Sequence, residues 1–232
     1  MTDSPTIALF DIDGTLLTTA GAGAASMRLA LSQEFSLTDP TIEIDFAGRT
    51  DRGIIRDLLA INHLPKTAAF ITRLQTAYLN HFPTMLRKLG GSLLPGAESL
   101  VRHCRRSPHV QTHVMTGNCR QSAWEKLSHF GLDRWVETVF GGENATTRTD
   151  LAHQTAAHLS LDPDCRDGNA HAVVIGDTPA DVLCGKAIGA TTIAVATGRF
   201  EADELKDVEP DLVVDELNDP RIDLLLKLDR FR

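Results

Sequence analysis

The chain has 232 residues, of which 42% are hydrophobic and 23% are charged, and these values exclude a disordered or collagen-like protein. Acidic residues outnumber basic ones by 31 to 23, and the absence of a basic block argues against a nucleic-acid partner. The four cysteines form no CxxC pair and no apolar stretch approaches the ~20 residues that span a bilayer, which favours a cytoplasmic protein with reduced thiols and no membrane partner.

The N-terminal part of the chain predicts one strand followed by helices. Residues 6–10 are a short apolar run that predicts a buried strand ending at Asp11. Apolar side chains then recur at helical spacing in three stripes, which predict three helices with no strand between them. These stripes lie at residues 24–35, 54–59 and 71–78. The prolines predicted to separate the helices are Pro40, Pro65 and Pro83.

From Leu93 onward, strand and helix patterns alternate along the chain. Strands are predicted at residues 110–115, 136–140, 172–175, 191–196 and 211–214. Helices are predicted at residues 97–106, 121–130, 150–159 and 180–188, the third capped by Thr149 or Asp150. This alternation predicts an α/β fold with a parallel, Rossmann-like sheet and helices on both of its faces.

The helical segment separates the first strand from the rest of the sheet. The simplest assembly places that strand in the later sheet and makes the segment an inserted all-helical cap. The predicted core is residues 1–17 and 91–232, and the predicted cap is residues 18–90. Gly21 and Gly23 suit one hinge, and residues 90–96 suit the other. Ligands of such sheets bind at the carboxyl ends of the strands, so the polar residues there are the candidates for function.

Two carboxylates follow the first predicted strand. Asp11 and Asp13 stand two residues apart, and they face one pocket if the chain is still extended there. Gly14 permits a sharp turn directly after them. Such a pair can hold Mg²⁺, which prefers oxygen ligands. The alternative interpretation is an ordinary acidic turn after a strand.

Two further strands end in polar residues. Thr116-Gly117-Asn118 offers a hydroxyl and free backbone N–H groups to a phosphate oxygen, or it is a simple helix cap. Asp177 and Asp181 lie one helical turn apart and can face one cation, or they belong to a capped helix. Four carboxylates at one sheet edge would repel each other without a cation, so together these residues predict a metal and phosphate site.

These motifs resemble those of the haloacid dehalogenase-like hydrolase superfamily, in particular its phosphoglycolate-phosphatase-like branch. Residues 11–15 match its DxDGT loop, and residues 114–118 match its second motif. Residues 176–181 match its GDxxxD motif, and the helical insert matches the helical cap of this branch. The resemblance covers nearly the whole chain.

The resemblance implies a Mg²⁺-dependent phosphatase that acts on small phosphorylated metabolites. Asp11 would attack the phosphorus and form an aspartyl-phosphate, and Asp13 would act as general acid and base. The metal would be held by the Asp11 carboxylate, the Asp13 backbone carbonyl and Asp177, with Asp181 behind them. Residues implied to bind the substrate are Gly14, Thr15, Gly117 and Asn118, beside the catalytic Thr116.

One position departs from the pattern of the family. The third motif usually supplies a lysine that pairs with the nucleophile, but residues 140–159 contain none. Arg148 is the cation in that stretch, so the role is carried to Arg148. Arg49 precedes a predicted cap helix and can reach a leaving group or a second acidic group of the substrate. Alternatively, Arg49 is a solvated residue next to Thr50 or Asp51, one of which is the N-cap of that helix.

Two other functions remain open at this stage. A phosphomutase resembling β-phosphoglucomutase would keep the aspartyl-phosphate long enough to return the phosphoryl group to a bound sugar. A non-catalytic protein that binds phosphorylated ligands would keep the fold without turnover. The sequence indicates neither the substrate nor the oligomeric state.

Overall fold

The computed structural model describes residues 5–161 and 171–228 of the chain. Its strands are β1 (Thr6–Phe10), β2 (Leu17–Thr18), β3 (Ser92–Leu93), β4 (Val110–Met115), β5 (Thr138–Phe140), β6 (His171–Gly176), β7 (Thr191–Val195) and β8 (Leu212–Val214). Its helices are α1 (Ala22–Phe35), α2 (Asp51–Ile61), α3 (Ala68–Leu89), α4 (Ala97–Arg106), α5 (Arg120–His129), the 3₁₀ helix η1 (Asp133–Trp135), α6 (Arg148–Leu159), α7 (Pro179–Ala187), α8 (Ala202–Lys206) and α9 (Pro220–Leu225).

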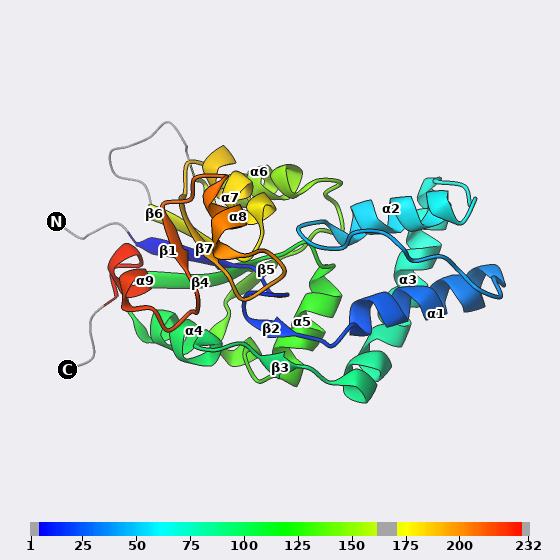
Figure 1. Cartoon of the computed structure of the whole chain (residues 1–232), viewed down its shortest axis with the longest axis horizontal. Helices are drawn as coiled ribbons and strands as arrows, with labels where there is room; N and C mark the ends of the chain where they lie inside the picture. Colours follow the sequence, from blue (N-terminus) through cyan, green and yellow to red (C-terminus); the bar gives the residue numbers. More distant parts are fainter. Residues whose placement is uncertain (1–4, 162–170, 229–232) are drawn as a thin grey trace.

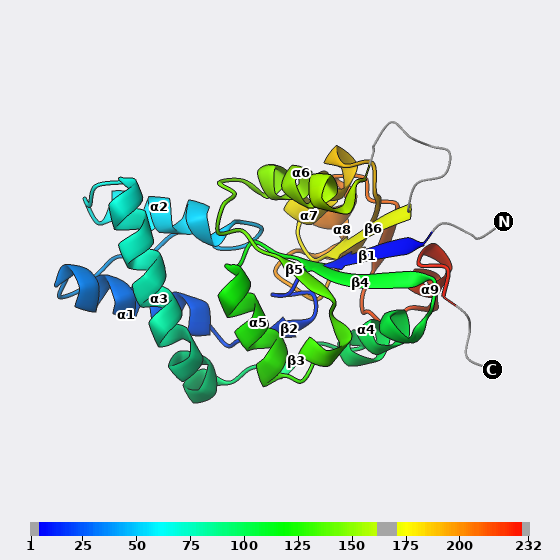
Figure 2. The same cartoon turned by 180° about the vertical axis from the view of Figure 1, so that it is seen from behind.

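Six strands form one sheet in the order β5-β4-β1-β6-β7-β8, and every pairing in it is parallel (Figures 1 and 2). The first strand pairs with β4 and β6, so the chain returns to both sides of it after the helical segment. The parallel α/β class predicted from the sequence is therefore confirmed. A strand with neighbours on both sides and helices on both faces needs apolar residues throughout, and β1 is buried along its whole length.

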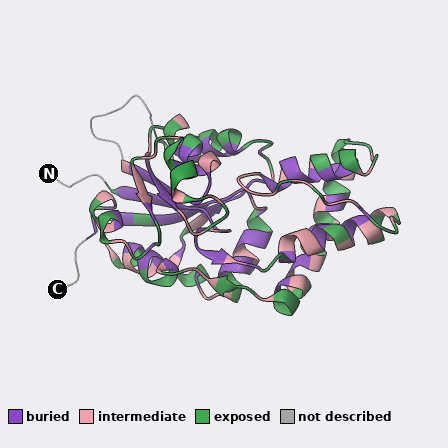
Figure 3. Ribbon diagram, in the orientation of Figure 1, coloured by how far each residue is buried: buried purple, intermediate pink, exposed green. Residues whose placement is uncertain are grey.

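Alternate side chains of β1 divide the core into two layers. Ala8 and Phe10 pack with residues of α4, α5 and α9 on one face. Ile7 and Leu9 pack with residues of α6 and α7 on the other. Each large apolar side chain buried in this way contributes about 1.5–3 kcal/mol to folding. The sheet is the most continuously buried part of the molecule (Figure 3).

The helices α1, α2 and α3 form a separate unit with a hydrophobic cluster of their own (Figures 1 and 3). The chain enters and leaves this unit beside the antiparallel pair β2 and β3, where Leu17 lies opposite Leu93. The prediction that Pro83 separates two helices is wrong, because Pro83 lies inside α3. Packing of the buried Phe82 and Leu86 against the other helices of the unit offsets the backbone hydrogen bond that proline removes.

Two smaller expectations also need correction. The N-cap of α6 is Thr147 rather than Thr149 or Asp150, because the Thr147 side chain and Asp150 form a reciprocal capping box. Residues 136–137 precede β5 instead of belonging to it, since Val136 ends the 3₁₀ helix η1. Cys165 lies outside the described residues. Among the described residues, no helix combines the length and the apolar character needed to cross a membrane.

The carboxyl ends of the central strands point toward the helical unit (Figure 1). Direct hydrogen bonds join the two parts there. The Asp51 backbone N–H donates to the Gly117 carbonyl at 2.7 Å, and the Asp51 carboxylate accepts from the Cys119 backbone N–H at 2.7 Å. The Thr50 hydroxyl donates to the Thr146 carbonyl at 3.0 Å. The loops that follow the strands are thus covered by the start of α2.

Candidate active site

The loop after β1 places Asp11 at the carboxyl end of the central strand. The Asp11 backbone N–H still donates to the Ile175 carbonyl at 2.9 Å, so this residue continues the sheet. Its side chain is nearly inaccessible to solvent. Gly14 then turns the chain with φ +83°, and a side chain there would collide with the Asp177 carboxylate. Glycine at this position therefore lets two strand ends approach each other.

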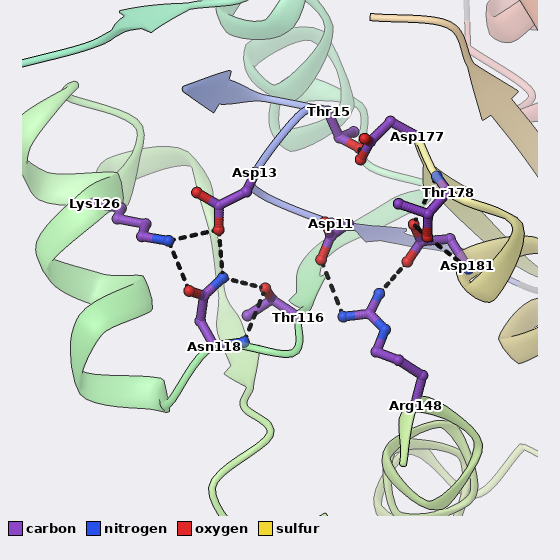
Figure 4. A network of polar contacts seen from close by, with 10 residues as sticks. All are labelled: Asp11, Asp13, Thr15, Thr116, Asn118, Lys126, Arg148, Asp177, Thr178 and Asp181. Carbon is purple, nitrogen blue, oxygen red and sulfur yellow. Dashed lines mark hydrogen bonds and ion pairs between the residues drawn. The ribbon is translucent and has the colours of Figure 1, made fainter. Parts of the chain in front are cut away.

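Arg148 opens α6 and is buried among carboxylates (Figure 4). Its Nη1 lies 3.2 Å from Asp11 Oδ1, and its Nη2 bonds to Asp181 Oδ1. Burial opposes its charge, but the carboxylates of Asp181 and Asp11 prevail and raise the pKa of Arg148. The guanidinium is thus a fixed positive charge beside the predicted nucleophile.

Three carboxylates meet behind the loop after β1. One oxygen from each of Asp11, Asp177 and Asp181 lies within 4.8 Å of the others. Burial, partly opposed by the Arg148 charge, raises the pKa of Asp11 to about 7. Burial and the charge of Asp181 raise the pKa of Asp177 to about 8. The pKa values of Asp11 and Asp177 thus stay raised despite Arg148, mainly because both groups are buried, and their oxygen atoms are suitable ligands for a hard divalent cation.

Asp181 caps its helix and also belongs to this group of three carboxylates. Its Oδ2 accepts from the Thr178 backbone N–H at 3.1 Å and from the Thr178 hydroxyl at 2.7 Å, completing a capping box at the start of α7. Its Oδ1 faces Arg148 and the other two carboxylates. Thr15 is fully buried, and its hydroxyl donates to Asp177 Oδ1 at 3.0 Å. The predicted substrate-binding residue Thr15 thus lies beneath the acidic cluster and holds one of its members.

The loop after β4 carries Thr116, Gly117 and Asn118 to the opposite side of Asp11 (Figure 4). The Thr116 hydroxyl is buried and accepts from the Asn118 side-chain amide at 2.7 Å. The same amide nitrogen donates to Asp13 Oδ2 at 2.7 Å. Asp13 is separate from the three-carboxylate cluster, because its side chain turns toward Asn118 and α5.

Lys126 also contacts Asp13, and the sequence did not predict a role for it. Its Nζ lies 2.5 Å from Asp13 Oδ2 and 2.6 Å from Asn118 Oδ1. One signal was present in the sequence. Lys126 stands on the buried face of its helix, one position before Leu127 and three after Ala123, where an apolar residue is the rule.

A cavity of about 410 Å³ lies between the helical unit and the strand ends. Asp11, Asp13 and Arg148 line one wall of it. The helical unit contributes apolar side chains to the other wall, among them Met27, Phe46, Ile54 and Tyr78. Gly14, Gly117 and Asn118 also line the cavity, whereas Thr15 does not. The cavity thus has a charged wall at the strand ends and a largely apolar wall from the helical unit, which suits a small ligand with one anionic end.

Arg49 lines the cavity from the helical unit. Its Nη2 lies 2.5 Å from Asp57 Oδ2, and its Nη1 donates to the Asp45 carbonyl at 3.2 Å. Thr50 caps α2, since its hydroxyl accepts from the Gly53 backbone N–H at 3.1 Å. Arg49 is therefore neither fully solvated nor directed at the strand ends, but it is partly exposed at the cavity wall.

Gly117→Ala is expected to lower kcat/KM by about 100-fold, because misplacement of the helical unit over the site disturbs its geometry. A side chain at this position would overlap the Arg49 carbonyl group. Steady-state kinetics gives the loss, and small-angle scattering gives the expected increase in radius of gyration. Wild-type values in both measurements would show that the start of α2 need not lie against Gly117 for turnover.

The sequence and the fold of this chain are similar to those of known proteins. Residues 8–195 match the family model described as haloacid dehalogenase-like hydrolase. A phosphoglycolate phosphatase of Cereibacter sphaeroides is 28% identical over 186 residues, which cover 78% of this chain and 80% of that protein. The crystal structure of a predicted phosphatase from Clostridium acetobutylicum superposes with a TM-score of 0.71 at 19% identity, covering 96% of this chain and 99% of that one. The structure of CbbY from Rhodobacter sphaeroides in complex with phosphate superposes with a TM-score of 0.67 at 14% identity, covering 93% of this chain and 96% of that one.

Proposed function

The chain belongs to the haloacid dehalogenase-like hydrolase family, and from this premise we propose that it is a Mg²⁺-dependent phosphatase that hydrolyses small phosphorylated metabolites. Its similarity to a phosphoglycolate phosphatase supports the phosphoglycolate-phosphatase-like branch of that family. One observation carries the proposal. Asp11 lies at the end of the central strand, beside a buried guanidinium, and one of its oxygens lies within 4.8 Å of an oxygen from each of two further carboxylates. This is the environment that a carboxylate nucleophile needs if it is to approach an anionic phosphate ester.

In the proposed reaction, an Asp11 carboxylate oxygen attacks phosphorus and the bond from phosphorus to the ester oxygen breaks. Asp13 gives its proton to the departing alcohol, which leaves an aspartyl-phosphate on Asp11. Water then attacks this phosphorus while Asp13 takes up a proton, so inorganic phosphate leaves and both carboxyl groups return to their starting states. Asp13 lines the same cavity as Asp11 and is part-exposed, which suits a group that exchanges protons.

The remaining side chains position the phosphoryl group. Thr116 and the backbone N–H groups of Gly117 and Asn118 would bind its oxygens from one side, and Arg148 from the other. The residues that would hold Mg²⁺ are Asp11, Asp177 and the Asp13 main-chain carbonyl, with Asp181 behind them. When bound, the ion would offset the repulsion between the phosphate ester and the carboxylates.

Residues 18–90 would act as the cap that closes over the substrate, and residues 1–17 and 91–232 as the catalytic core. Three features support this division. The helices of residues 22–89 have their own hydrophobic cluster, they are joined to the sheet beside β2 and β3, and they supply the apolar wall of the cavity. Arg49 on that wall would meet the part of the substrate that lies away from phosphorus.

Phosphate release from a panel of phosphorylated metabolites, with Mg²⁺ and with a chelator, tests the proposal. The expected result is release that requires Mg²⁺, with the highest kcat/KM on a small ester that fits a cavity of about 410 Å³. Turnover that appears only after addition of a sugar bisphosphate would favour a phosphomutase. Binding of the esters without any release, by folded protein in the presence of Mg²⁺, would exclude a phosphatase and favour a non-catalytic binding protein.

A further inference from the structure

Lys126 is a buried cation at the edge of the site. Its side chain is 4% exposed, and it reaches the cavity from the inner face of α5. It lies against Asp13 rather than Asp11, whose partner is Arg148. The two predicted working carboxylates thus have different cations (Figure 4). A lysine this deeply buried needs partners for its charge, and the partners it has are groups of the proposed reaction.

Lys126, Asn118 and Asp13 form a closed ring of hydrogen bonds. Lys126 Nζ donates to Asp13 Oδ2 at 2.5 Å and to Asn118 Oδ1 at 2.6 Å. Asn118 Nδ2 donates to the same Asp13 Oδ2 at 2.7 Å. Two donors therefore occupy one oxygen of Asp13. A proton on this carboxyl group must reside on the other oxygen, Oδ1, because Oδ2 already accepts from a lysine and an amide.

We propose that Lys126 is a positioning residue that holds Asp13 as the proton donor of the reaction. This inference rests on the proposed phosphatase function. Lys126 keeps Oδ2 occupied and the carboxyl group in one rotamer, so Oδ1 presents the proton to the ester oxygen when the bond to phosphorus breaks. The alcohol leaves with that proton, and the Asp13 carboxylate that remains keeps its bond to Lys126.

The helical unit covers Lys126 and completes this arrangement. Lys126 Nζ lies 5.5 Å from the centroid of the Phe82 ring, a cation–π distance, and Phe82 belongs to α3. The ring is fully buried. Closing of the cap would therefore exclude water from the pair of Lys126 and Asp13, which strengthens their interaction.

Lys126→Met tests the proposal, since methionine keeps an unbranched stem beneath Phe82 and removes only the charge and its donors. The first-turnover rate of alcohol release should be measured on two esters. One is the alkyl phosphate that the wild type hydrolyses best, and the other is p-nitrophenyl phosphate, whose leaving group departs without a proton. The expected loss is about 100-fold or more on the alkyl ester and less than about fivefold on the nitrophenyl ester. The KM values should change little.

Lys206→Met is the matched control, because Lys206 is exposed on α8 and pairs with the exposed Asp203, away from the site. It should retain wild-type rates on both esters. If Lys126→Met does not fold, as judged by circular dichroism, Lys126→Gln gives the same comparison with a smaller predicted loss.

Equal losses on the two esters would overturn the proposal and assign Lys126 to the phosphoryl group or to structure alone. Unchanged rates on both would overturn it as well. A wild type that hydrolyses neither ester with Mg²⁺ present would instead refute the phosphatase function, so the two failures are distinguishable.

Discussion

Asp11→Asn is expected to abolish phosphate release, with kcat at least about 10⁴-fold below the wild type. The amide cannot attack phosphorus, and the two other carboxylates of the acidic cluster, Asp177 and Asp181, lie behind it. Acid quenching during turnover followed by mass spectrometry checks the cause. The wild-type peptide that contains Asp11 should carry one added phosphoryl group, and the variant peptide should carry none.

At pH 8 and without metal, the Asp11→Asn variant should have a higher melting temperature than the wild type. Burial raises the pKa of Asp11 to about 7, so its ionised form is unfavourable in the folded protein even beside Arg148. A neutral amide removes that penalty, so the melting temperature rises while the activity disappears. Asp203→Asn is the control, since Asp203 is 93% exposed and should change neither quantity. Turnover by Asp11→Asn within about tenfold of the wild type would place the nucleophile elsewhere.

The carboxyl ends of the strands were predictable because their pattern is local. An apolar run that stops at a polar residue identifies Asp11, Thr116 and Asp177, and a parallel sheet brings such residues to one edge whatever the loops between them do. The place of β1 in the later sheet was also predicted, whereas its pairing with β4 and β6 in particular was not. For this reason the sheet and the acidic cluster were predictable without knowledge of any tertiary contact.

Other features depend on contacts between distant segments. The role of Lys126 requires that α5 lie beneath Phe82 and beside Asp13, and no spacing in the chain specifies this. Pro83 was misplaced because local rules disfavour proline within a helix, whereas packing of the helical unit overrides them. The contact of Asp51 with Cys119 joins the two parts of the molecule and has no sequence signature.

The acidic cluster should make the metal-free protein less stable as the pH rises from 6.5 to 8. The pKa of Asp11 is raised to about 7 and that of Asp177 to about 8, mainly by burial, against 3.8 for an ordinary aspartate. In this range the folded protein therefore holds protons that the unfolded chain has released, so the free energy of unfolding falls with increasing pH. The expected loss is about 2 kcal/mol, or about 5 °C in melting temperature for a chain of this size.

Mg²⁺ should oppose that trend, because the proposed site would bind it through ionised carboxylates, and the ion would then stabilise the folded protein more at pH 8 than at pH 6.5. Melting curves at both pH values, with Mg²⁺ and with a chelator, measure the effect. Burial lowers the pKa of His113 and of His171, so at the lower end of this range the unfolded chain binds protons that these residues release on folding, and their contribution opposes the trend. Asp177→Asn should make stability depend less on pH and should also reduce the stabilisation by Mg²⁺. The Asp177 carboxylate is expected both to titrate in this range and to bind the ion. A wild-type protein whose stability without metal is constant over this range would show that the pKa values of Asp11 and Asp177 are not raised in the folded protein.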